Sequence, residues 1–294
     1  MPYGMTMLLL LAYVTTLTLS QGARATTGTC QQSGSMVRVP GVSELSGLAV
    51  SRSLAGRLWT HNDSGQPTLF ALSADGAVSS RVQLTGVKLQ DWEAVAVGPC
   101  PSGSCVYAGD IGDNTARRQR VAVYRFPEPA ASQTSAGVKE VFYGTYPDGA
   151  QDAEALLVAP DGSIYIVTKG ETGPVALYRF PRDLRVGTVH TLESIGKPRN
   201  GAKAANTDRI TDGTVSANGQ WVALRTARRV TFHRAASLFA GDWTSDRAID
   251  LKDVAEPQGE AVALGPAGAV YVGGEAGPKA AAGTFARFSC SEFQ

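Results

Sequence analysis

The chain has 294 residues, with 27 Lys and Arg against 26 Asp and Glu, so its formal net charge is +1. This balance excludes strong electrostatic attraction to nucleic acid or to an anionic membrane, and we expect neither as a partner. The 33 glycines and 15 prolines, without a long apolar stripe of helical period, predict many short strands joined by tight turns.

An apolar run occupies residues 5–19 near the start of the chain, and a step of two small residues, Ala23 and Ala25 around Arg24, follows it. This pattern is typical of a signal peptide cleaved after Ala25, although no Lys or Arg precedes the run. A membrane anchor is the alternative, but the run is shorter than the ~20 apolar residues that a spanning helix needs. We therefore predict a secreted, extracellular protein with a signal peptide at 1–25 and one domain at 26–294; a later start codon or an uncleaved form stays open.

One unit recurs five times along the rest of the chain. Each copy contains an acidic or small polar residue, an apolar strand, a Gly-rich turn, a second apolar strand, a polar loop and a third strand. The copies begin at Ser43, Asp91, Asp152, Thr211 and Gln258. Between them lie β-like stretches, such as RVQLTG and KEVFYGTYP, that are placed to form a fourth strand.

Four antiparallel strands repeated at this spacing are typical of β-propeller blades. A two-sheet sandwich would also contain strand-turn-strand segments, but it would not repeat the same hairpin five times. We predict an all-β fold, a single β-propeller of five four-stranded blades. A sixth, degenerate blade between Pro181 and Asn206 stays open.

The two ends of the domain are predicted to meet. The fifth copy ends at Cys290 after three strands, whereas residues 35–40 form a strand with no earlier partner. We expect this N-terminal strand to complete the last blade and close the ring. A disulfide between Cys30 and Cys290 would then lock the ring, and Cys100 with Cys105 would close one short turn. Four paired cysteines agree with an oxidising compartment, and the lack of a CxxC motif gives zinc no support.

Blade geometry places many polar residues on one face, because the start of each innermost strand and the end of the second strand open on the same side. We call this the polar face. The candidate metal ligands there are the acidic residues Glu44, Asp91, Glu93, Asp110, Asp152, Glu154, Asp212 and Glu260. The candidate substrate contacts are Asn62, Asp113, Asn114, Lys169 and Arg225. The turns of the opposite face carry no comparable cluster.

A ring of carboxylates is unfavourable unless positive charge lies among them, because like charges raise each other's pKa. One solution is a bound hard cation, and Ca²⁺ is the natural candidate because all the offered ligands are oxygens. The other is internal pairing with basic residues and no metal; the candidates are Lys169, Arg117, Arg118, Arg225 and Arg228. A third interpretation is structural, since acidic residues before a strand often cap backbone N–H groups.

Features that occur once are better candidates for catalysis than features that every blade repeats. His61 is the only histidine expected on the polar face, and we predict that it acts with Asp63, His61 as a general base near neutral pH. An ordinary hydrogen-bonded loop histidine is the alternative. Trp92 either packs between blades or stacks on a sugar. The sequence has no GxSxG, HExxH or P-loop motif, so a hydrolase would depend on carboxylates, a metal or His61.

The blade openings also carry a family resemblance. The segments DWEAVAVG, DAEALLVAPDGSIYIV and QGEAVALGPAGAVYV, with LWTHNDSG, GDIGDN and VYRFPEP, resemble the secreted bacterial propellers grouped as phytase-like, or "esterase-like activity of phytase", proteins. β-Propeller phytases place several Ca²⁺ ions on acidic residues at the channel mouth and hold phosphate with basic residues. By that pattern the cation ligands would be Asp91, Glu93, Asp152, Glu154, Asp212 and Glu260. Lys169 and Arg225 would contact phosphate.

Together these features predict a secreted, monomeric propeller that binds Ca²⁺ on its acidic rim and hydrolyses a phosphate ester, an ester or a lactone. The alternative is a non-catalytic module that binds a glycan or a protein partner on the same face. Glycan binding would require solvent-exposed aromatic residues at the channel mouth, and the candidates are Trp59, Trp92 and Trp221.

Overall fold

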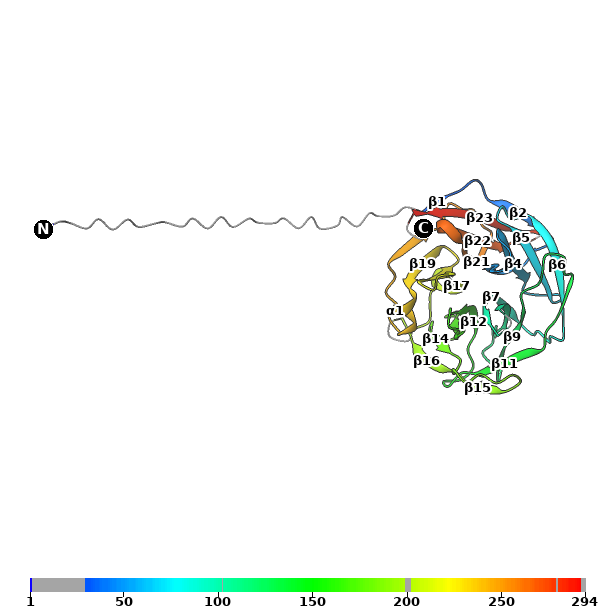
Figure 1. Ribbon diagram of the computed structural model, residues 1–294, viewed down its shortest axis with the longest axis horizontal. Helices are drawn as coiled ribbons and strands as arrows, with labels where there is room; N and C mark the ends of the chain where they lie inside the picture. Colours follow the sequence, from blue (N-terminus) through cyan, green and yellow to red (C-terminus); the bar gives the residue numbers. More distant parts are fainter. Residues whose placement is uncertain (2–29, 102, 199–201, 279, 292–294) are drawn as a thin grey trace.

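The computed structural model describes residues 1, 30–101, 103–198, 202–278 and 280–291. Five sheets surround a central axis as the blades of a propeller (Figure 1), which confirms the predicted fold. The predicted signal peptide lies outside the described residues. In the described part of the chain, no helix is long and apolar enough to cross a membrane.

Each blade has four strands that follow one another from the axis outward. Blade 1 contains β3 (Leu45–Val50), β4 (Arg57–Asn62), β5 (Thr68–Ser73) and β6 (Val78–Thr85). Blade 2 contains β7 (Trp92–Cys100), β8 (Gly103–Asp110), β9 (Val121–Pro127) and β11 (Glu140–Thr145). Blade 3 contains β12 (Ala153–Val158), β13 (Ile164–Thr168), β14 (Leu177–Arg179) and β16 (Glu193–Gly196). Blade 4 contains β17 (Ile210–Val215), β18 (Trp221–Thr226), β19 (Arg229–Arg234) and β20 (Arg247–Asp250). Blade 5 contains β21 (Gln258–Leu264), β22 (Ala269–Glu275), β23 (Ala282–Cys290) and β2 (Val37–Pro40). The helical elements are short: α1 (Ala235–Phe239), η1 (Asn206–Asp208) and η2 (Pro266–Gly268).

Two further strands cross from one blade to the outer edge of the preceding blade. β10 (Ser135–Gly137) pairs parallel to β6 of blade 1, and β15 (Val189–Thr191) pairs parallel to β11 of blade 2. These strands cover edges that would otherwise expose unpaired backbone groups. The segment considered for a sixth blade supplies β15 and β16 instead, so the described residues form no sixth sheet.

The ring closes as predicted. β2 pairs with β23, and β1 (Cys30–Gln32) pairs with the end of the same strand, placing Cys30 opposite Cys290. The disulfide between these two cysteines is present, with a Cα–Cα distance of 4.1 Å. Both ends of the propeller domain are therefore held in blade 5.

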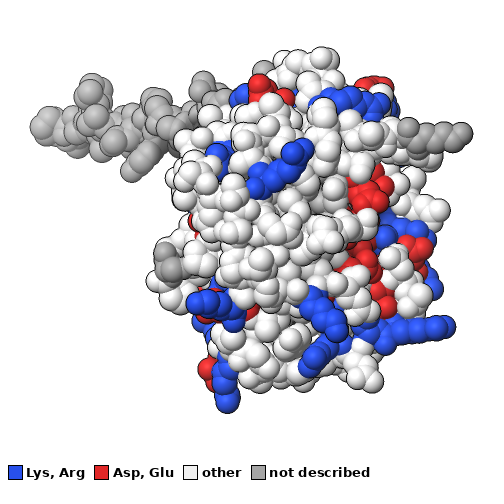
Figure 2. Space-filling model, turned by 90° about the vertical axis from the view of Figure 1, so that its right-hand side faces the viewer, with Lys and Arg blue, Asp and Glu red and all other residues white. Residues whose placement is uncertain are grey.

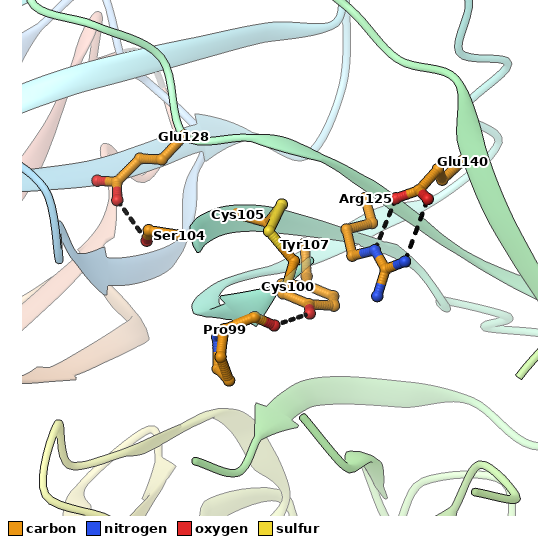
Figure 3. The surroundings of a disulfide bond; sticks show 8 residues. All are labelled: Pro99, Cys100, Ser104, Cys105, Tyr107, Arg125, Glu128 and Glu140. Atoms are coloured by element: carbon orange, nitrogen blue, oxygen red, sulfur yellow. Dashed lines mark hydrogen bonds and ion pairs between the residues drawn. A yellow bond between two sulfur atoms is a disulfide. The ribbon is translucent and has the colours of Figure 1, made fainter. Parts of the chain in front are cut away.

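The second predicted disulfide, Cys100–Cys105, closes the hairpin between β7 and β8 (Figure 3). The Tyr107 hydroxyl donates to the carbonyl oxygen of Pro99 at 2.5 Å, which fixes the start of the same turn. Two disulfides are compatible with an extracellular protein.

The tryptophans considered for glycan stacking are buried. Trp59, Trp92 and Trp221 are 0, 2 and 6 % exposed. The Trp92 indole N–H donates to the carbonyl oxygen of Ala94 at 2.8 Å, and that of Trp59 donates to the Glu128 carboxylate at 2.9 Å. These residues pack the blades, and their burial counts against sugar stacking at the channel mouth.

Candidate functional site

A β-bulge interrupts the innermost strand of every blade close to its first residue. The strand pairing shifts between Leu45 and Leu48 in blade 1 and at the matching place in the other four blades. The bulged positions hold the polar residues Ser46, Glu93, Glu154, Thr211 and Glu260. Because a bulge changes the direction of a side chain, the same irregularity repeated five times produces a polar ring, which we call the bulge ring.

Hydroxyl groups tie the bulge ring together. The Ser46 hydroxyl donates to the backbone carbonyl oxygen of Glu93 at 3.0 Å, and the Thr211 hydroxyl donates to that of Glu260 at 2.8 Å. In both cases the bond joins one blade to the next. The glutamates are thus held on a backbone that neighbouring blades fix.

Carboxylates gather around the bulge ring on the polar face. This acidic cluster consists of Glu44, Asp63, Asp91, Glu93, Asp152, Glu154, Glu260 and Glu275. Figure 2, a view from the side, shows acidic and basic side chains together along one edge of the molecule. Glu93 lies within hydrogen-bonding reach of both Glu154 and Asp91.

Burial makes several of these carboxyl groups hard to ionise. It raises the pKa of Glu93 to about 8, and the charge of Asp91 adds to this effect. Burial and the nearby Glu44 carboxylate raise the pKa of Asp63 to about 7. Burial and Glu260 raise the pKa of Glu275 to about 7. The cluster therefore holds protons near neutral pH.

Lys169 is the cation at the centre of the acidic cluster. Its Nζ lies 2.5 Å from Glu154 Oε1, 3.9 Å from Asp152 Oδ2 and 3.9 Å from Glu171 Oε2. Burial opposes its charge, but Glu154 and Asp152 raise the pKa of Lys169 above the usual range. Internal pairing, one of the two solutions considered for the carboxylate ring, is thus present.

The loop after β8 is fixed by its own acidic residues. The Asp110 carboxylate accepts from the backbone N–H of Asp91 at 2.8 Å and pairs with Arg118 at 3.0 Å. The Asp113 carboxylate accepts from the backbone N–H of Arg118 at 2.6 Å, and the Asp113 N–H donates to Asp152 at 2.8 Å. Asp110 and Asp113 therefore fix the conformation of the loop, and the Asp113 N–H joins it to Asp152, which precedes the first strand of blade 3.

Gly112 brings this loop directly against two carboxylates of the cluster. A Cβ atom at position 112 would lie 2.6 Å from Asp91 Oδ2 and 2.7 Å from Glu93 Oε1. Only glycine permits this approach without displacing the carboxylates.

An open cavity of about 960 Å³ adjoins the loop. Its polar lining includes Gln90, Asp91, Asp113, Asn114, Arg117, Arg118 and Arg120. The Arg120 guanidinium lies over the Tyr143 ring, 4.1 Å from its centroid. Through Asp91 the cavity reaches the acidic cluster, so a bound molecule would contact arginines and carboxylates together.

Three residues predicted on the polar face are fully buried instead, namely Asp212, Arg225 and His61. Asp212 is fully buried and accepts from the backbone N–H groups of Gly213 at 2.7 Å, Val262 at 2.8 Å and Leu48 at 3.4 Å. It follows the bulged position of blade 4, and its carboxylate binds the innermost strands of three blades together. These bonds are those that the structural interpretation of the acidic residues expects at this position.

Arg225 is also fully buried. Its Nη1 donates to the carbonyl oxygens of Ala261 at 2.7 Å and Gly273 at 2.9 Å, and its Nη2 pairs with Glu256. The guanidinium therefore joins blades 4 and 5, and no part of it is available for a phosphate group.

His61 lies beneath the polar face rather than on it. Its ring is 0 % exposed and stacks on Trp92, with centroids 4.0 Å apart and an angle of 5° between the planes. Burial lowers the pKa of His61 to about 3, so the ring is neutral. His61 belongs to β4 rather than to a loop, and its Nδ1 lies 3.0 Å from the carbonyl oxygen of Asn62. The position is therefore closer to the alternative of an ordinary hydrogen-bonded histidine and gives a general-base role no support. The neighbouring Asn62 accepts from the Glu44 N–H at 3.0 Å, and Asp63 belongs to the acidic cluster.

The predicted calcium ligands do not form a ligand set. Among the residues that the structure describes, no group of three or more His, Cys, Asp or Glu is arranged to hold a metal ion. Ca²⁺ requires six to eight oxygens, whereas an ammonium group already lies among these carboxylates. The donor arrangement therefore does not fit the Ca²⁺ that the family resemblance implies.

The similarity of this chain to known proteins concerns the fold alone. No protein-family model matches the chain, and no curated protein matches its sequence. The PQQ-bound aldose sugar dehydrogenase from Streptomyces coelicolor is 11% identical, with a TM-score of 0.52, over 91% of this chain and 100% of that chain. A gluconolactonase from Xanthomonas campestris is 15% identical, with a TM-score of 0.47, over 84% of this chain and 72% of that chain. At such identities a likeness concerns architecture alone, and the architecture shared is the β-propeller.

Proposed function

We propose that this chain is an extracellular hydrolase that cleaves a carboxylic ester, a lactone or a phosphate ester at the acidic mouth of its channel. One observation carries the proposal: Asp91 lines a cavity of about 960 Å³ and lies beside Glu93. Through Asp91 the cavity adjoins the group formed by Glu93, Glu154 and Lys169. The base thus lies on the wall of a space where a small molecule can bind, and the acid and the cation lie in the acidic cluster that adjoins this wall.

Glu93 is suited to act as the general acid. With its pKa raised to about 8 by burial, it carries a proton at neutral pH and can give it to the leaving oxygen. Asp91 lies on the cavity wall. Burial and the Asp152 carboxylate raise its pKa, which makes it a stronger base than an ordinary carboxylate, while a hydrogen bond with Glu93 and the nearby Arg118 favour its ionised form. It can therefore take a proton from the attacking water. Two neighbouring carboxyl groups with different environments are a common basis for such a division of roles.

The step balances without a redox partner. Water attacks the carbonyl carbon or the phosphorus, and its proton passes to Asp91. The bond to the leaving oxygen breaks, and that oxygen takes the proton of Glu93. The Lys169 ammonium, 2.5 Å from Glu154, lies close enough to the cluster to stabilise negative charge that develops on the substrate. The phytase-like character of the blade motifs supports the same class of reaction, and no step requires Ca²⁺.

The proposal is tested with p-nitrophenyl acetate, p-nitrophenyl phosphate and gluconolactone as substrates. We expect turnover of at least one of them, and a roughly 100-fold or greater loss of kcat in Glu93→Gln and Asp91→Asn. Glu193→Gln, on the outer strand β16, is the matched control and should retain full activity. Binding without turnover would replace the hydrolase with the non-catalytic module. Turnover that survives both substitutions would refute the catalytic roles given to Glu93 and Asp91.

A further inference from the structure

The opposite mouth of the channel is lined by apolar side chains. A cavity of about 480 Å³ opens there, where the five innermost strands come to their ends. Each of these strands contributes one branched apolar residue to the wall: Val50, Val97, Val158, Val215 and Leu264. The volume lies within the range typical of small-molecule sites and corresponds to about 16 water molecules at roughly 30 Å³ each.

Arg52 lies across the opening of this cavity. Its Nη2 donates to the carbonyl oxygen of Ala217 at 3.2 Å, which joins the β3–β4 loop of blade 1 to the β17–β18 loop of blade 4. Blades 1 and 4 are not neighbours in the ring, so the side chain spans the mouth. Of the described residues that line the cavity, Arg52 alone carries a charge.

The backbone beside Arg52 is held in place by a half-buried carboxylate, that of Glu128. The Glu128 carboxylate accepts from the N–H groups of Arg52 at 3.3 Å and Ser53 at 3.2 Å, and from the Ser104 hydroxyl at 2.7 Å. The charged head of Arg52 itself remains exposed. Only one of its guanidinium N–H groups is used by Ala217, so donors remain for an anionic partner.

The two mouths are separate sites. Between them the Leu48 N–H of blade 1 donates to the Asp212 carboxylate of blade 4 at 3.4 Å, and both residues are fully buried. This contact joins innermost strands of blades that are not neighbours, so the channel is closed between its ends.

We propose that the apolar mouth binds a small amphipathic carboxylate. Its apolar part would enter the cavity among the valines, where its removal from water is favourable. Its carboxylate would pair with the guanidinium of Arg52, which binds planar anions through two parallel hydrogen bonds. This site goes beyond the proposed hydrolase and does not depend on it.

Decanoate is a suitable probe, with the uncharged decanamide as its matched ligand, and binding is measured by isothermal titration calorimetry. We expect wild-type protein to bind decanoate, and Arg52→Gln to weaken that binding by about tenfold or more while decanamide binding is unchanged. Val215→Asp should abolish binding of both ligands. If the Val215→Asp variant does not fold, Val97→Asp, on another part of the wall, serves the same purpose. Val186→Asp, on the outer surface, is the control and should bind normally.

The results separate the possibilities clearly. Failure of the wild-type protein to bind decanoate at millimolar concentration would overturn the proposal, and so would decanoate binding that Val215→Asp and Val97→Asp leave unchanged. Equal affinities of wild type and Arg52→Gln for decanoate would overturn the role of the arginine and hence the choice of an anion. None of these measurements uses the hydrolytic activity, so each stands whether or not the polar face is catalytic.

Discussion

The protonated state of Glu93 predicts an unusual dependence of stability on pH. Burial raises its pKa from an ordinary value of 4.5 to about 8. The folded protein therefore keeps a proton that the unfolded chain has already lost. The resulting stabilisation is fully present below the unfolded pKa and is lost as the pH rises through the folded pKa.

The size of the effect follows from the shift. One pKa unit corresponds to about 1.4 kcal/mol, so ionisation of an isolated group of this kind would lower the free energy of unfolding by about 2 kcal/mol between about pH 6 and pH 8. Glu93 shares its environment with Asp91, Glu154 and Lys169, which spread the change over several groups. We expect the contribution of Glu93 itself to be about 1–2 kcal/mol, or roughly 2–8 °C in melting temperature for a domain of this size.

The assay is differential scanning calorimetry at about pH 6 and pH 8. Wild-type protein should melt at a lower temperature at the higher pH, and Glu93→Gln should show a clearly smaller decrease, because the amide cannot lose the proton. Glu193→Gln, exposed on β16, is the control and should follow the wild type. Identical decreases in wild type and Glu93→Gln would refute the conclusion that Glu93 is protonated at neutral pH, and with it the role of general acid.

Three further predictions concern the ring and its charges. Asp212→Ala should lower the free energy of unfolding in urea by about 3–5 kcal/mol, because three backbone N–H groups lose their acceptor; a loss below about 1 kcal/mol would contradict the bridging role. Replacing both cysteines of the terminal disulfide with serine removes a cross-link of sequence separation 260 and should cost about 5 kcal/mol. The same change in the hairpin disulfide, with a separation of 5, should cost only about 2 kcal/mol, so equal losses would be evidence against ring closure by the termini. Lys169→Gln should make the melting temperature rise with added Ca²⁺ more than in wild type, because the carboxylates lose their internal cation; equal Ca²⁺ responses would show that Lys169 does not replace a metal.

The blade count and the ring closure could be predicted from the sequence because both depend on local patterns. Each copy of the repeat contains its own turn and its own alternation of apolar residues. Both patterns can be recognised within that copy alone, without knowledge of the rest of the fold. The strand at residues 35–40 had no partner strand, and the fifth copy of the repeat had three strands instead of four, so pairing the two completed a blade. The crossing strands β10 and β15 could not be predicted, because three-residue parallel pairings to a preceding blade leave almost no pattern in the sequence.

The site was predictable only in outline, since the sequence indicates which residues are polar but not where a bulge directs them. Ser46 and Thr211 occupy the same place in the repeat as Glu93 and were missed because they are not acidic. Asp212 lies one residue further along, and its carboxylate accepts from backbone N–H groups of three blades instead of joining the acidic cluster. His61 is at the end of β4, yet Trp92 of the next blade covers it, and a contact between blades is not visible in one segment.

The same five innermost strands produce two mouths of opposite character because the bulge acts at one end only. At the start of each strand an extra residue turns a polar side chain toward its neighbours, and the carboxylates collect around Lys169. Past the bulge the regular alternation resumes, and the strands reach the other face with branched apolar residues. Asp212 and Leu48 close the channel between these ends. A substitution in the bulge ring should therefore alter chemistry on the polar face without changing what binds beside Arg52, because no open path connects the two.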